Sequence, residues 1–110
     1  MNGYKVLEEA AKLQGIATLD DNLKIIGLPI INAILGEMGF SESTSLSNLI
    51  GLPSVSHRRT LISGTAMLIA NAVGDTSAAR AFSADYNKKL SIIKGETLKV
   101  KDVMPKGEWL

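Results

Sequence analysis

Apolar residues recur at three- and four-residue steps in four segments of the chain, which is the spacing of one face of an α-helix. The first segment opens with Asn2 as an N-cap and stops at Gly15. The second follows Asp20 and Asp21, either of which can cap it, and carries an apolar stripe that ends at Met38. The first 38 residues therefore predict two amphipathic helices.

Pro29 interrupts the apolar stripe of the second segment. A proline inside a helix removes one backbone donor, and its ring presses on the carbonyl group of the residue four positions earlier. The helix therefore either kinks near Ile25 or begins at Pro29. We expect the kink, because the stripe passes through the proline without a change of phase.

Residues 39–56 are rich in Ser, Gly and Pro, which predicts a long connection between helices. Three apolar residues are expected to hold this connection against the core: Leu46, Leu49 and Ile50. A third helix then starts near Ser54 or Ser56 and ends at a Gly74 cap. It carries almost no charge after its first turn, so we expect it at the centre of the fold. Its small residues would let neighbouring helices approach closely: Ser63, Gly64, Ala66, Ala70 and Ala72.

The fourth segment predicts a helix that is capped by Asp75 or Thr76 and ends at Gly95. Phe82 and Tyr86 are four residues apart and therefore share one face, which favours a core position for the tyrosine.

After Gly95, apolar residues alternate with lysines, a weak signal for a short extended segment. An isolated strand cannot satisfy its own backbone groups, so such a tail is either disordered or adds itself to another chain. The fold prediction is all-α: a compact bundle of about four helices over residues 1–95, with an extended C-terminal tail over residues 96–110. Trp109 suits a core and an interface equally well. We expect the tail to bind a partner through Leu98, Lys99, Val100, Lys101, Val103 and Trp109.

The composition narrows the classes of function. A chain of 110 residues has the size of one domain. It has no cysteine and one histidine, which fits a reducing compartment and excludes disulfides and thiolate metal sites. No segment has the apolar length of a signal peptide or a membrane span, so we expect a soluble, cytoplasmic protein without a membrane partner.

Candidate catalytic residues are few. His57 lies close to Ser54 and Ser56, but neighbours at a helix start predict a cap rather than a nucleophile and base with a third group behind them. Glu8 and Glu9 are consecutive, so they do not face one another on a helix. The glycines follow no phosphate-binding pattern. We therefore expect no enzyme activity, no cofactor and no metal.

The charge is uneven along the chain. Residues 1–57 carry three basic and six acidic side chains, a net charge of −3, whereas residues 58–110 carry nine and five, a net charge of +4. The basic half is either an ordinary solvated surface or a face turned toward an acidic partner or DNA. Arg58 and Arg59 begin the third helix, where cations oppose the helix dipole. Their partner is either a nearby carboxylate or an acidic protein surface or phosphate of another molecule.

Four segments in this order resemble a known family: NGYKVLEEAAKLQGI, IINAILGEM, SLSNLIGLP and LISGTAMLIANAVGDTSAARAFSADYNKKLSIIK. The chain is similar in them to the small head-to-tail connector, or adaptor, proteins of tailed phages and prophages of Gram-positive bacteria. The resemblance covers most of the chain and lies in the order of the parts. Pro29 departs from the unbroken second helix expected in that family.

The resemblance implies a helical subunit of the virion, assembled in the host bacterial cytoplasm as a ring of about twelve or thirteen copies. The ring would dock under the portal, contact the next neck or tail component, and extend or close the channel for the packaged DNA. Two alternatives are a small helical DNA-binding or regulatory module and another tail-completion protein of a prophage. Against a DNA-binding module, the third helix is nearly all apolar after Thr60, whereas a recognition helix carries polar side chains on an exposed face.

Overall fold

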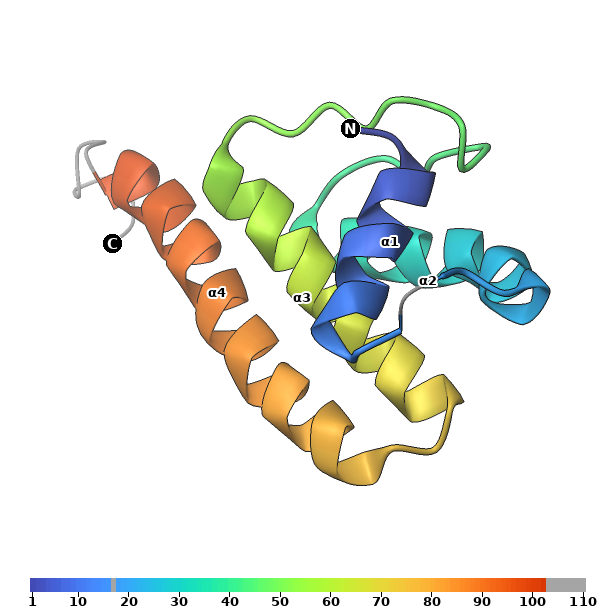
Figure 1. Ribbon diagram of the computed structural model, residues 1–110. Helices are drawn as coiled ribbons and strands as arrows, with labels where there is room; N and C mark the ends of the chain where they lie inside the picture. Colours follow the sequence, from blue (N-terminus) through green and yellow to red (C-terminus); the bar gives the residue numbers. More distant parts are fainter. Residues whose placement is uncertain (17, 103–110) are drawn as a thin grey trace.

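A computed structural model describes residues 1–16 and 18–102 of the chain, with the backbone alone for residues 96–102. Its helices are α1 (Gly3–Leu13), α2 (Asp21–Met38), α3 (Val55–Ala72) and α4 (Thr76–Asp102), shown in Figure 1. Within the described ranges the β-structure is an isolated antiparallel bridge between Asn2 and Leu49. The all-α prediction, a bundle of about four helices, is therefore confirmed.

The predicted N-caps are present at all four helix starts, and the structure decides the alternatives in favour of Asp20, Ser54 and Asp75. Each cap side chain accepts a hydrogen bond from a backbone N–H group three residues later, which satisfies a donor that has no partner inside the helix. These bonds join Asn2 to Lys5, Asp20 to Leu23, Ser54 to His57 and Asp75 to Ala78, at 2.9, 2.7, 3.2 and 3.0 Å.

Helix α2 continues through Pro29, so the alternative that it begins at the proline is wrong. It ends at Gly39, whose φ of 87° lies in the left-handed region that a side chain disfavours. Helix α3 ends at the predicted place: Val73 is its cap residue, and Gly74, with a φ of 80°, follows it in the left-handed region.

Helix α3 is the central element, as its lack of charge predicted. It packs against each of the other three helices, and Figure 1 shows it between α4 on one side and α1 and α2 on the other. Gly64 lies where three helices meet, because a Cβ atom added there would be 2.8 Å from both Ile34 of α2 and Tyr86 of α4. The tyrosine is 2% exposed, so its predicted core position is confirmed.

The connection between α2 and α3 is held by two of the three apolar residues expected. Leu46 is buried and Ile50 is partly buried against the core, whereas Leu49 is 80% exposed, so its prediction is wrong. Backbone contacts explain the difference, because Leu49 meets Asn2 through its main chain and leaves its side chain in solvent.

The fourth helix does not end at Gly95. Unlike Gly39 and Gly74, this glycine is not in the left-handed region, and the helix continues through residues 96–102. The strand-like conformation predicted for Leu98 to Val100 is therefore wrong. The predicted C-terminal extension is present, since the last turns of α4 run on past the start of α3 (Figure 1), but it extends as a helix up to Asp102.

Candidate functional site

The start of α3 brings a serine and a histidine together more closely than the sequence analysis assumed. Ser54 Oγ lies 2.7 Å from His57 Nδ1, and the same hydroxyl accepts the backbone N–H of His57 at 3.2 Å. The ring is packed edge-on against Phe40, with 5.7 Å between the ring centroids. No carboxylate of the described residues hydrogen-bonds to the imidazole. The pair is therefore arranged as a helix cap rather than as a nucleophile with an oriented base.

Arg58 and Arg59 are exposed in the first turns of α3. Among the side chains that the structure describes, which end at Gly95, no carboxylate lies within ion-pair distance of either guanidinium. The nearby carboxylate that would neutralise them is thus not found in this part of the chain. Two cations at the positive end of a helix dipole favour contact with an anionic surface.

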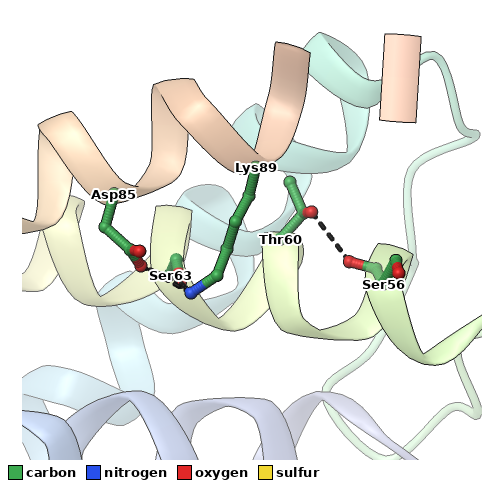
Figure 2. A network of polar contacts seen from close by, with 5 residues as sticks. All are labelled: Ser56, Thr60, Ser63, Asp85 and Lys89. Atoms are coloured by element: carbon green, nitrogen blue, oxygen red, sulfur yellow. Dashed lines mark hydrogen bonds and ion pairs between the residues drawn. The ribbon is translucent and has the colours of Figure 1, made fainter. Parts of the chain in front are cut away.

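Ser63, Asp85 and Lys89 form a polar cluster between α3 and α4 (Figure 2). The Ser63 hydroxyl donates to Asp85 Oδ2 at 2.9 Å and accepts from Lys89 Nζ at 3.0 Å, while Lys89 donates to Asp85 Oδ2 at 2.6 Å. The hydrogen bond from Lys89 lowers the pKa of the Asp85 carboxyl more than its partial burial raises it. Because Ser63 Oγ, Asp85 Oδ2 and Lys89 Nζ each bond to the other two, the cluster fixes the register of the two helices.

Tyr86 makes a second polar link across the bundle. Its hydroxyl donates to Glu37 Oε1 of α2 at 2.8 Å. Burial of the ring, followed by the hydrogen bond to Glu37 and the negative charge of that carboxylate, raises the pKa of this phenol. The tyrosine therefore stays protonated and joins α4 to α2 while it fills the core.

A shallow apolar groove opens between α2 and the last turns of α3, and we call it the α2–α3 groove. Its volume is about 630 Å³. It is lined by Ile25, Ile26, Pro29, Ile30 and Ala33 of α2 and by Leu68, Asn71 and Ala72 of α3. Ile25 is 73% exposed, although it is a large aliphatic residue. The groove is thus an apolar surface that the described part of the chain leaves uncovered.

This groove is not among the sites predicted from the sequence. The sequence nevertheless contains a signal for the groove, because the apolar residues of α2 extend beyond one stripe and surround most of the helix between Leu23 and Leu35. Such a helix has more apolar surface than α1 and α3 can cover.

The six residues predicted to bind a partner are not brought together on a described surface. Leu98, Lys99, Val100 and Lys101 belong to the last turns of α4, and their side chains lie outside the described features. Val103 and Trp109 lie outside the described residues.

Metal sites and membrane-spanning helices are two further features that would indicate a function. Over residues 1–16 and 18–102, no group of three or more His, Asp or Glu side chains is placed to hold a metal ion. None of the helices described is both long enough and apolar enough to cross a membrane.

Comparison of the chain with models of known protein families, with characterised proteins and with solved structures finds no match. Function is therefore inferred from the chain's own residues and geometry.

Proposed function

We propose that this protein is a structural, non-enzymatic subunit of a phage or prophage virion: a head-to-tail connector that assembles as a ring under the portal. The observation that carries the proposal is the uncovered α2–α3 groove. A contiguous apolar surface on a small protein marks a site for another protein, because water on it is released when a partner binds. Ile25, at the open side of α2, is a large aliphatic side chain that is 73% exposed in the monomer and that a partner could cover.

Two further features support an assembly role. The last turns of α4 run on past the start of α3, so the described end of this helix lies at the edge of the bundle, where another molecule could contact it. The polar groups that would suggest chemistry have structural partners instead: Ser54 with His57 caps α3, and Lys89 with Asp85 joins α3 to α4. The resemblance to connector proteins is the reason for proposing this particular assembly, with the portal on one side of the ring and a neck or tail component on the other.

The test is native mass spectrometry of the purified protein, alone and with the portal protein encoded in the same genome. We expect a complex with about twelve or thirteen copies on a portal ring. Ile25→Lys should weaken assembly without unfolding the chain, because the side chain is already 73% exposed. Leu49→Lys is the matched control, since that residue is 80% exposed and lies in the α2–α3 connection. A wild-type protein that stays monomeric with the portal would contradict the proposal.

The second candidate is a DNA-binding module, which Arg58 and Arg59 favour, because both are exposed and neither has a carboxylate partner among the side chains described up to Gly95. Helix α3 itself cannot enter a DNA groove, because it is enclosed by the other three helices. Its exposed first turns, which carry both arginines, are free to contact phosphate. Fluorescence anisotropy with duplex DNA would separate the candidates: a phosphate contact predicts affinity that falls with salt and falls further in Arg58→Ala/Arg59→Ala.

A further inference from the structure

We propose that the α2–α3 groove of one copy holds residues 103–110 of a neighbouring copy, with Trp109 as the anchor. This inference deepens the proposed function and depends on it, because it specifies how one subunit of the ring grips the next. It assigns a partner to an apolar surface and to a tail whose roles are otherwise open.

The chemistry of the groove suits an apolar tail with one polar hydrogen-bond donor. Its α2 side is aliphatic, with Ile25 and Pro29 facing solvent. Asn71 is the polar member of the lining. Residues 103–110 read VMPKGEWL, with apolar side chains at both ends. A tryptophan ring buries a large apolar surface and needs an acceptor for its indole N–H, which the Asn71 side-chain oxygen can supply.

The groove lies too far from the end of α4 for the same chain to fill it easily. Asn71 borders both this groove and a second pocket that Ser83 of α4 also lines, so the groove lies near the level of Ser83. From there to Asp102, 19 residues of helix span about 28 Å. Trp109 is seven residues beyond Asp102 and reaches at most about 25 Å, even if the chain reverses at once. A neighbouring copy has no such limit.

The charges at the open end of the groove fit the tail. Asp21 precedes Ile25 by one helical turn and is exposed on the same side of α2. Lys106 precedes Trp109 by three residues. With the indole ring in the groove, the lysine is close enough to pair with an acidic residue at the N-terminus of α2, which also sets the direction of the tail.

The groove and the tail are different surfaces, so the contact between two copies is heterologous: one copy contributes its groove and the other its tail. Heterologous contacts between identical copies form a closed ring when the rotation from one copy to the next adds up to a full turn, and an open helix when it does not. The groove and the tail thus supply the type of contact that a ring needs, whereas a groove-to-groove contact would stop at a dimer.

Disulfide cross-linking of the full-length chain tests the inference, because the natural chain has no cysteine. Ala33→Cys places a thiol in the groove at an exposed position, and Glu108→Cys places one beside Trp109. We expect disulfide-linked dimers only when the two variants are mixed, and a ladder of multimers when one chain carries both substitutions. Ala81→Cys, exposed on α4, replaces Ala33→Cys as the control and should give no cross-link to the tail.

Three results would overturn the inference. A double-cysteine chain that closes only on itself would show that the tail fills its own groove. Cross-linked dimers of Ala33→Cys alone would show that two grooves face each other. Mixed variants that give no dimers under conditions where the wild type assembles would show that the tail lies elsewhere.

Binding measurements provide an independent readout. Trp109→Ala and Ile25→Lys should each weaken self-association at least about tenfold, and the double variant should lose little more, because both remove the same contact. Trp109→Ala should leave the melting temperature of the dilute protein unchanged. A clear decrease in melting temperature would place the indole ring in the core of its own chain and overturn the inference. Portal binding is measured on the same samples. Portal binding with no tail–groove cross-link rejects this contact alone, whereas the cross-link without portal binding supports the contact and rejects the connector function.

Discussion

Replacing Gly64 with alanine should destabilise this protein, although the same change stabilises most helices. Gly64 lies inside α3, where alanine loses less backbone entropy than glycine and is favoured by about 0.5–1 kcal/mol. The added Cβ, however, would lie 2.8 Å from Tyr86 Cε1 and 2.8 and 2.9 Å from two carbons of Ile34. All three atoms are buried, so either α2 or α4 must move away from α3.

The magnitude follows from these two opposed effects. Overpacking of a closed core costs about 1–3 kcal/mol, and the helix preference offsets up to about 1 kcal/mol of it. The net loss of unfolding free energy should therefore reach about 2 kcal/mol. Gly36→Ala is the matched control, because Gly36 lies in α2 with nothing within 4 Å of an added Cβ. That variant should gain about 0.5–1 kcal/mol.

Urea denaturation followed by circular dichroism measures both changes. The two variants should differ by about 1–3 kcal/mol in unfolding free energy, the overpacking contribution alone, and by about 4 °C or more in melting temperature. Ile34→Val removes one of the crowded carbons, so it should cost less in the Gly64→Ala background than in the wild type. If Gly64→Ala is as stable as Gly36→Ala, the three helices do not meet as closely as described, and the reasoning fails.

Three further predictions concern the core, the α3 cap and the polar cluster. Ile69→Asp should prevent folding, because Ile69 is fully buried and the carboxylate would have no partner; a cooperative unfolding transition for this variant would contradict the core assignment. Ser54→Ala should lose about 0.5–2 kcal/mol of stability through the cap, whereas His57→Ala should leave assembly with the portal intact, as measured by native mass spectrometry. Lys89 lowers the pKa of Asp85 in the folded state, so this carboxylate contributes stability above its ordinary pKa of 3.8 that is lost as the pH falls through the lower, folded-state pKa. Asp85→Asn should therefore flatten the acid side of the stability–pH curve, and an unchanged curve would show that the ion pair does not contribute.

The helix starts could be predicted from the sequence because capping is local. An Asn, Asp or Ser side chain reaches a backbone N–H group three residues later, so the cap depends on a handful of neighbouring residues. The helix end at Gly95 was predicted wrongly for a related reason. Glycine ends a helix only where the chain turns into the left-handed region, and inside a helix it costs only about 1 kcal/mol, which the rest of a long helix tolerates.

The contacts between helices could not be predicted, because each depends on how whole helices pack. Tyr86 and Glu37 are 49 residues apart, and Ser63 and Lys89 are 26 apart. The apolar stripe of α2 was visible in the sequence, but which part of it would be covered depends on the angle at which α2 crosses α3. The exposure of Ile25 is therefore a property of the packing alone.

The central position of α3 has a consequence for synthesis on the ribosome. Helices α1 and α2 emerge first, yet both pack against α3, which begins at Val55. The first half of the chain therefore cannot complete its core until residues near Ala72 have left the exit tunnel. Until then, the isoleucines of α2 remain exposed to solvent. Helices α3 and α4, in contrast, are joined by the short segment between Ala72 and Thr76 and form a local hairpin whose closure costs little entropy. Folding of the new chain is thus expected to begin at this late hairpin and to draw the earlier helices onto it.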